Sequence, residues 1–331
     1  MTLTPLRVGI VSWAHVHAPG LAASVAALPG ARLAGIHDED AQRGRAAADE
    51  NDVPWCAELS ALFERSDAVV IASTNARRRA YVEAAAAAGL HVLTEKPLAT
   101  TLADGRAMVE ACRTAGVELG TAFPVRSSAA VQSLRAAIRS GSIGEVRAAR
   151  GTNPGQYPGR WFGDPKEAGR GAVMDHVVHL ADALRWLLDD EVRTVYAELG
   201  ALMHHLEVED SGIVMLEFTR GVFASIDCSW SRPRTYPTWG GVTLHLVADR
   251  ATVDVDVFGQ TLTHYDDRSG HVRSVTWGED LTKRMVGDFL DAVREGRPAP
   301  ISGEDGLRAL EVAIASYRSA ELARTVSIAE L

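Results

Sequence analysis

The sequence predicts an α/β protein of two domains: a parallel sheet covered by helices comes first, and an α+β domain built on an open, mostly antiparallel sheet follows. From residue 6 to residue 123, short and almost continuously apolar segments alternate with helical ones, which is typical of parallel strands buried on both faces. After residue 124, longer segments of alternating character are separated by turns, which indicates antiparallel strands. A length of 331 residues also favours two domains. We therefore place the domains at residues 1–124 and 125–331, with C-terminal helices that can pack back on the first.

The first domain is expected to contain five strands joined by helices. The strands lie at residues 6–12, 31–38, 67–73, 91–97 and 117–123. The helices lie at residues 19–28, 40–51 and 102–115, and a further one ends near Gly89. Pro19 stands at an early helical position, where a missing N–H leaves no hydrogen bond unmade, and Pro97 stops the fourth strand.

The second domain is expected to begin with a helix at residues 128–140, followed by the turn GSIGEV and a strand. A glycine-rich loop at residues 151–171 precedes a helix at residues 173–188. Five more strands are then expected at VRTVYAEL, GIVMLEFT, VFASIDCSW, VTLHLVAD and ATVDVDVF. Helices near residues 280–295 and 303–324 close the chain.

The composition is that of a folded protein that handles small molecules. Hydrophobic residues make up 47% of the chain and charged residues 23%, which leaves ample material for a core. A formal net charge of −9 argues against a nucleic-acid-binding surface. Cys56, Cys112 and Cys228 are widely spaced and odd in number, so we expect neither a disulfide scaffold nor a zinc knuckle, and a cytoplasmic location. We identify no signal peptide and no membrane-spanning segment.

The loop after the first strand is placed where a nucleotide-binding fold keeps its glycines. In VGIVSWAHVHAPG, at residues 8–20, Ser12, Ala14 and His17 occupy the three positions where glycines would fall. The loop is expected to lie against a pyrophosphate, with backbone amides and His15 or His17 replacing part of the glycine geometry. The alternative is a metal-dependent hydrolase, because His-x-His after a first strand is also how such enzymes begin a metal site.

Asp38 is expected at the tip of the second strand. A carboxylate there can accept both ribose hydroxyls of NAD and repel the 2′-phosphate of NADP. Capping the next helix is an alternative role, and it is compatible with the first. His37 and Arg43 nearby leave NADP possible.

The stretch EKPLA begins just past the fourth strand, at the sheet edge where ligands bind. Lys96 stands between Glu95 and a proline-stiffened turn, so its ammonium is positioned and could be directed toward a substrate hydroxyl or a nicotinamide. The alternative is an ordinary surface pair of Glu95 and Lys96.

The helix at residues 173–188 carries an acid and an imidazole on one face. Asp175, His179 and Asp182 follow the helical period, whereas His176 points elsewhere. Because burying such groups is costly unless they are satisfied, the pair Asp175 and His179 suits proton transfer. A capped or salt-bridged helix is the alternative, and in a hydrolase these residues could complete a metal cluster with the first loop.

Taken together, these motifs resemble the glucose–fructose oxidoreductase/inositol dehydrogenase (Gfo/Idh/MocA) family over nearly the whole chain. The resemblance rests on the strand–loop–helix start and on DAVVIASTN, HVLTEKPLA, SGSIGEV, GRGAVMDHVVH and ISGEDGLRALEVAIASYRSA. It implies a Rossmann domain, and an open antiparallel sheet through which dimers or tetramers form. The chain departs from the family pattern at the three glycine positions already named, at Val177 and Arg170 in place of glycine, and at Arg78 where histidine is frequent.

The resemblance implies roles for individual residues. Lys96 would contact the substrate and the nicotinamide, and Asp175 and His179 would bind the reacting hydroxyl and relay its proton. The expected cofactor-binding residues are Ser12, Trp13, Ala14, His15, Asp38, Ser73, Thr74, Asn75, Glu95 and Lys96. The expected substrate-binding residues are Arg126, Arg160, Trp161 and His176, and no metal ligands are assigned.

The function hypothesis is therefore an oxidoreductase that uses NAD, with NADP possible, and acts on a secondary alcohol of a sugar, inositol or related polyol. The alternatives are the metal-dependent hydrolase, a non-redox or lyase-like member of the same fold, and a sensor that binds the cofactor without turnover. The expected partners are a small-molecule substrate and further copies of the chain, with no nucleic acid and no membrane.

Overall fold

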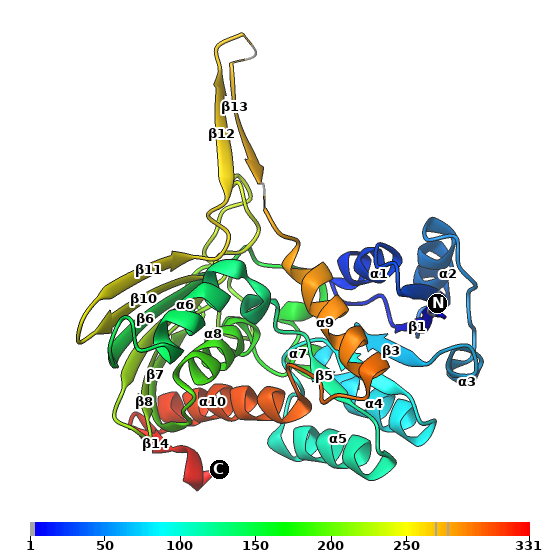
Figure 1. The fold of residues 1–331 in the computed structure, drawn as a ribbon, viewed down its shortest axis with the longest axis horizontal. Helices are drawn as coiled ribbons and strands as arrows, with labels where there is room; N and C mark the ends of the chain where they lie inside the picture. The colour runs from blue at the N-terminus through cyan, green and yellow to red at the C-terminus, as the bar shows by residue number, and fades with distance from the viewer. Residues whose placement is uncertain (1–3, 269, 277) are drawn as a thin grey trace. The chain divides into compact units, whose positions relative to one another are not determined.

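The computed structural model describes residues 4–268, 270–276 and 278–331, and the chain divides into two units (Figure 1). The first unit comprises Met1–Pro124, Pro158–Arg170 and Thr282–Glu311. The second comprises Val125–Tyr157, Gly171–Leu281 and Val312–Leu331. The first break follows Pro124, where the sequence analysis also divides the chain. The segment 158–170, which that analysis gave to the second domain, belongs to the first unit. Residues 282–311 also belong to it, in keeping with the expectation that C-terminal helices can pack back on the first domain.

A five-stranded parallel sheet forms the centre of the first unit. Its order is β2-β1-β3-β4-β5, and every neighbouring pair is parallel. The strands are β1 (Leu6–Val11), β2 (Ala31–His37), β3 (Ala68–Ile71), β4 (His91–Thr94) and β5 (Leu119–Thr121). All five expected strands are present, which confirms the parallel-sheet domain. The chain order reverses between β1 and β3, and ligands bind at the carboxyl ends of strands at such a switch point.

Helices cover this sheet and provide the loops at its edge. They are α1 (Ala18–Ala26), α2 (Ala41–Glu50), α3 (Leu59–Phe63), α4 (Arg78–Ala87), α5 (Leu102–Ala115), α7 (Pro165–Ala168), α9 (Leu281–Glu295) and the first part of α10 (Gly303–Leu322). The 3-10 turns η1 (Asn75–Arg77) and η3 (Arg160–Gly163) also lie in this unit. Gly44 of α2 is needed because a Cβ there would lie 2.1 Å from the Trp55 ring and 2.7 Å from Cβ of Asp38. The close approach of α2 therefore fixes the end of β2.

A seven-stranded sheet forms the second unit, in the order β11-β10-β6-β9-β8-β7-β14. Its strands are β6 (Val146–Pro154), β7 (Val192–Gly200), β8 (Ser211–Phe218), β9 (Phe223–Ser229), β10 (Thr243–Ala248), β11 (Thr252–Asp256) and β14 (Val326–Ser327). All neighbouring pairs are antiparallel except β6 with β9. The expected mostly antiparallel sheet is thus confirmed.

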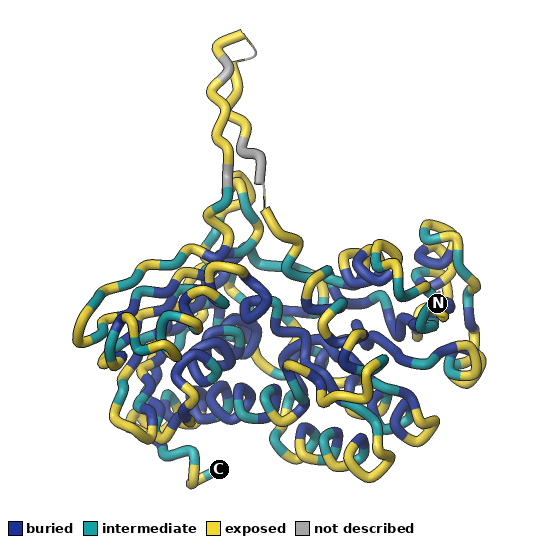
Figure 2. Tube along the Cα trace, in the orientation of Figure 1, coloured by how far each residue is buried: buried dark blue, intermediate teal, exposed yellow. Residues whose placement is uncertain are grey.

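The helix α8 (Ala172–Leu188) packs on one face of this sheet, against β6, β8 and β9, and most of its residues are buried (Figure 2). The helix α6 (Ala129–Arg139) packs against α8. The other face of the sheet exposes Ile213, Met215, Phe223 and Val247, which the strand register places on one side. Polar side chains such as Arg150, Glu217 and Asp227 share this face, and nothing among the described residues covers the four apolar ones.

A hairpin of β12 (Thr261–Asp266) and β13 (His271–Thr276) forms a separate two-stranded sheet that the sequence analysis did not predict. It extends away from the seven-stranded sheet (Figure 1). Leu262, Tyr265 and Val272 are exposed on it. Among the helices of the described residues, none is long and apolar enough to cross a membrane.

Candidate cofactor-binding and proton-transfer residues

The loop after β1 adopts a left-handed backbone conformation at the position where a nucleotide-binding fold keeps a glycine. Ser12 has φ of 69°, in the left-handed region that favours glycine, and is fully buried. Its N–H donates to His37 O at 2.7 Å, and its hydroxyl accepts the Ala14 N–H at 3.3 Å. A serine there keeps the glycine-type turn at a cost of about 1 kcal/mol in backbone strain. The loop thus retains the geometry of a nucleotide-binding turn without its glycine.

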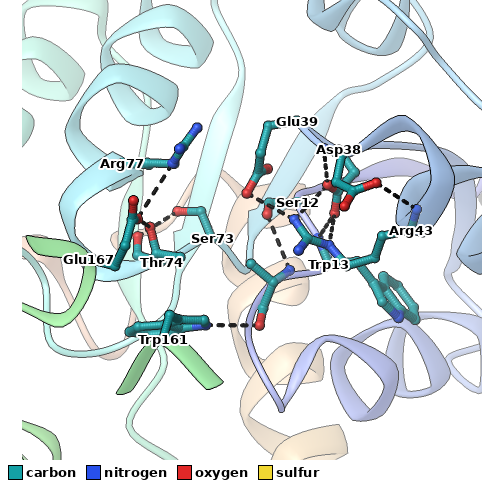
Figure 3. A network of polar contacts seen from close by, with 12 residues as sticks. Ser12, Trp13, Asp38, Glu39, Arg43, Ser73, Thr74, Arg77, Trp161 and Glu167 are labelled. Atoms are coloured by element: carbon teal, nitrogen blue, oxygen red, sulfur yellow. Dashed lines mark hydrogen bonds and ion pairs between the residues drawn. The ribbon is translucent and has the colours of Figure 1, made fainter. Parts of the chain in front are cut away.

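Asp38 directly follows β2 and is held by four donors (Figure 3). Its Oδ2 accepts the Trp13 N–H at 2.5 Å and Arg43 Nε at 2.9 Å. Its Oδ1 accepts the Asp40 N–H at 2.6 Å and Arg43 Nη2 at 2.7 Å. The helix α2 is capped by Asp40 and not by Asp38, so the capping role considered for Asp38 is wrong. The carboxylate instead ties the end of β2 to the loop after β1.

Glu95 and Lys96 follow β4 and are both 2% exposed. The Lys96 N–H donates to Glu95 Oε2 at 3.1 Å. The fully buried Arg78 donates to the carbonyl oxygens of Pro97 and Ser73. This guanidinium joins the turn after β4 to the end of β3, so Arg78 has a supporting role that the sequence analysis did not assign. The surface-pair alternative for Glu95 and Lys96 is wrong, because both residues are buried.

Two histidines of the first loop lie beside Glu95. His17 Nδ1 is 3.0 Å from Glu95 Oε1, and His15 Nδ1 is 3.9 Å from the same oxygen. Burial strips the charged imidazole of its solvation and lowers the pKa of His15 well below its ordinary value. Burial by itself would raise the pKa of Glu95, but the contact with His17 and the charge of Lys96 stabilise the carboxylate and hold that pKa well below its usual range. Glu95 is therefore ionised and His15 neutral at physiological pH.

The segment 158–170 is fastened to both loops at the carboxyl ends of β1 and β3 (Figure 3). Trp161 Nε1 donates to Ala14 O at 3.0 Å, and Thr74 Oγ1 donates to Glu167 Oε2 at 2.7 Å. Asn75 Nδ2 donates to Ala168 O at 2.9 Å. The structure thus brings Ala14, Thr74 and Asn75, predicted for the cofactor, into contact with the segment that carries Trp161, predicted for the substrate. Arg160 is exposed, and the Ser73 hydroxyl donates to Thr74 O. Glu167 was missed, since nothing in its local pattern marks it.

Two buried atoms in this region fit a bound dinucleotide. His15 Nε2 and Asn75 Oδ1 have no hydrogen-bond partner among the described residues. Buried polar atoms are normally satisfied, so each is suited to a group on a ligand. His15, the turn at Ser12 and the amino end of α1 make up the type of loop against which a pyrophosphate binds, and Asn75 begins the turn after β3.

Asp175 of α8 lies in the second unit and is buried. Its Oδ2 accepts Trp230 Nε1 at 3.2 Å and lies 3.1 Å from His176 Nε2. His176 Nδ1 is 2.6 Å from Asn153 O, which orients the ring. The expectation that His176 points away from Asp175 is wrong, because the long imidazole side chain spans the angle between consecutive helical positions. His179 lies one turn after Asp175 and is partly exposed.

Arg126 forms a buried bidentate ion pair with Asp182 on α8. Its Nε donates to Asp182 Oδ2 at 2.8 Å, and its Nη2 donates to Oδ1. Removing one partner of such a pair leaves a buried charge and costs about 3–5 kcal/mol. The pair fixes the chain ahead of α6 to α8, and the substrate contact of Arg126 stays a prediction.

The strand order, the left-handed turn after β1 and the carboxylate at the end of β2 define a dinucleotide-binding domain of the Rossmann type. The family model described as "Oxidoreductase family, NAD-binding Rossmann fold" matches residues 6–123, and the GFO/IDH/MocA C-terminal domain matches residues 131–260. The chain belongs to the GFO/IDH/MocA family of NAD-binding oxidoreductases. These matches give the metal-dependent hydrolase no support.

The chain is similar to several named relatives and to solved structures. It is 32% identical to a 1,5-anhydro-D-fructose reductase from Ensifer adhaerens, over 90% of this chain and 92% of that one. It is 28% identical to a myo-inositol 2-dehydrogenase from Thermotoga maritima, over 80% of each. The crystal structure of GenD2 from gentamicin A biosynthesis, in complex with NAD, superposes with a TM-score of 0.89 at 24% identity, covering 99% of this chain and 97% of that one.

Proposed function

We propose that the protein transfers a hydride between a nicotinamide cofactor and a secondary alcohol carbon of a sugar, inositol or related polyol. The proposal rests on the presence, in an NAD-binding oxidoreductase, of the two groups that this reaction needs. One is a cation that can stabilise charge on the reacting oxygen, and the other is an acid–imidazole pair that can move its proton. A buried lysine follows β4, and an acid and an imidazole stand one helical turn apart on α8. The names of the two relatives support a small polyhydroxylated substrate.

In the proposed reaction, the bound dinucleotide supplies the hydride acceptor for oxidation or the donor for reduction. His179 accepts the hydroxyl proton during oxidation and returns it during reduction. Asp175, fixed by Trp230 and His176, orients the reacting hydroxyl or the imidazole. Lys96 stabilises negative charge that develops on the oxygen. The segment around Trp161 contributes an aromatic face for the C–H surface of a sugar.

The experiment that tests this function is a screen of the purified protein with NAD⁺ and with NADP⁺. Inositols, aldoses and anhydrosugars are supplied one at a time, and the absorbance of the reduced nicotinamide is followed. The proposal expects at least one polyol to be oxidised, with release of the matching ketone. Tight binding of NAD⁺ with no turnover of any polyol would instead support the sensor hypothesis.

Cofactor preference follows from the surroundings of Asp38. Glu39 also pairs with Arg43, at 3.0 Å, so two carboxylates oppose one guanidinium where a 2′-phosphate would lie. We therefore expect NAD to be preferred over NADP. Asp38→Asn removes one of these charges and is expected to raise the ratio of kcat/KM for NADP to that for NAD by about tenfold, which corresponds to about 1.4 kcal/mol.

The matched control is Asp40→Asn, two positions further on, which alters the cap of α2 and leaves the pair of Asp38 and Arg43 in place. Its ratio of kcat/KM for NADP to kcat/KM for NAD should equal that of the unaltered protein. An unaltered protein that prefers NADP, or an Asp38→Asn ratio that does not change, would contradict this assignment.

We further propose that copies of the chain associate through the exposed face of the seven-stranded sheet, as a dimer or tetramer, and that the enzyme acts in the cytoplasm. Ile213, Met215, Phe223 and Val247 support the association, since exposed apolar side chains gathered on one face mark interaction surfaces. The three free cysteines support the cytoplasmic location, because thiols persist in a reducing compartment.

A further inference from the structure

His15, His17 and Glu95 bring three metal-ligating side chains together in the first unit. One ligand atom from each residue lies within 4.8 Å of the other two. The separations from Glu95 Oε1 to the Nδ1 atoms of His17 and His15 are 3.0 Å and 3.9 Å. Ligands around a tetrahedral zinc ion, at bond lengths of about 2.0–2.2 Å, are about 3.3–3.6 Å apart. The two separations from Glu95 Oε1 bracket this spacing, so the three side chains could surround one ion after local adjustment.

The hydrogen bonds of the cluster indicate which atoms would bind a metal. The His17 N–H donates to His15 Nδ1 at 3.2 Å, so Nδ1 is the unprotonated nitrogen of the His15 ring, and a metal ion there would replace this hydrogen bond. Glu95 Oε2 is occupied by the Lys96 N–H, which leaves Oε1 as the ligating oxygen.

Burial and charge indicate which metals fit. His15 and Glu95 are almost fully buried, whereas the His17 side chain is 37% exposed and offers a route from solvent. Two imidazoles and a single carboxylate oxygen favour Zn²⁺ and similar transition ions over Mg²⁺ or Ca²⁺, which require more oxygen ligands. The nearby cations Lys96 and Arg78 disfavour a further positive charge at His15, so the site favours an ion with strong affinity for imidazole.

We propose that His15, His17 and Glu95 form a binding site for a divalent transition metal ion such as Zn²⁺, with a fourth position open to water or another ligand. His17 is the residue before α1, and the amino end of this helix is where a pyrophosphate binds in this fold. The metal and the dinucleotide accordingly compete for the free enzyme. This competition rests on the proposed function, whereas the metal site itself does not.

The test uses Co²⁺, whose visible absorption becomes intense in tetrahedral coordination. Tag-free, metal-depleted full-length protein is titrated with Co²⁺, and Zn²⁺ is then added. We expect one equivalent of Co²⁺ to produce a tetrahedral spectrum that Zn²⁺ abolishes. His17→Ala, at a partly exposed position, should weaken Co²⁺ binding by at least about tenfold.

The matched control is His245→Ala, which removes an imidazole paired with Asp254 at 2.7 Å on a surface strand. This variant should bind Co²⁺ as the unaltered protein does. A flat titration, or equal binding by His17→Ala, would overturn the metal site. A Co²⁺ spectrum that saturating NADH leaves unchanged would contradict the competition alone, and failure of the polyol screen would leave the metal site unaffected.

Discussion

Lys96→Met is expected to lower kcat by about 10²- to 10³-fold while NADH still binds, because the substitution removes a charge that stabilises the developing oxyanion. Lys96 is 2% exposed, so a side chain of similar length without charge keeps the packing of the turn after β4. The substitution also removes a positive charge that lowers the pKa of the neighbouring Glu95. Steady-state rates together with NADH fluorescence titration measure both quantities.

The control for Lys96→Met is Lys166→Met, which removes an exposed ammonium from α7 in the same unit. Its kcat should match that of the unaltered protein. Full turnover by Lys96→Met would refute the role given to this lysine. A loss of NADH binding equal to the loss of kcat would assign Lys96 to the cofactor and not to the reacting oxygen.

His179→Asn should lower kcat by about 10²- to 10⁴-fold, the usual contribution of a positioned acid–base group. The amide keeps a polar side chain at this partly exposed position of α8 but cannot take up the hydroxyl proton. The decline in oxidation rate at low pH, which protonation of the base produces, should disappear from the residual activity. The pH dependence of kcat for both proteins checks this.

His205→Asn is the matched control, because His205 is exposed in the second unit and has φ of 51°, a conformation that asparagine tolerates. It should keep both kcat and the pH profile. An unchanged kcat in His179→Asn would exclude this residue as the base. A reduced kcat with the original pH profile would reassign His179 to positioning.

The fold could be predicted from the sequence because its strands are short, buried and separated by clear helical segments. Val8, Ile10 and Val11 of β1 and all four residues of β3 are buried, as near-continuous apolar runs predict. The hairpin of β12 and β13 was missed because its described side chains are largely exposed and polar residues interrupt the alternation. The short α3 was missed because five residues carry little periodicity.

The site could be predicted only in part. Motif positions identified Lys96, Asp38 and Asp175, and all three are buried, as constrained groups should be. Their partners depend on contacts between residues far apart in the sequence. Trp161 and Ala14 are separated by 147 positions, and Thr74 and Glu167 by 93. Periodicity fixes which face of an element a residue occupies, but it does not determine which distant side chain packs against that face.

The claim that underlies the whole account is that Lys96 and His179 act on one alcohol group. The most direct measurement is a crystal structure of the protein with NAD⁺ and a polyol that the screen identifies. The account predicts that Lys96 Nζ and a ring nitrogen of His179 both lie within hydrogen-bond distance, about 2.6–3.2 Å, of the hydroxyl on the carbon that faces the nicotinamide. A productive complex in which either atom contacts a different part of the substrate, or no substrate atom, would contradict it.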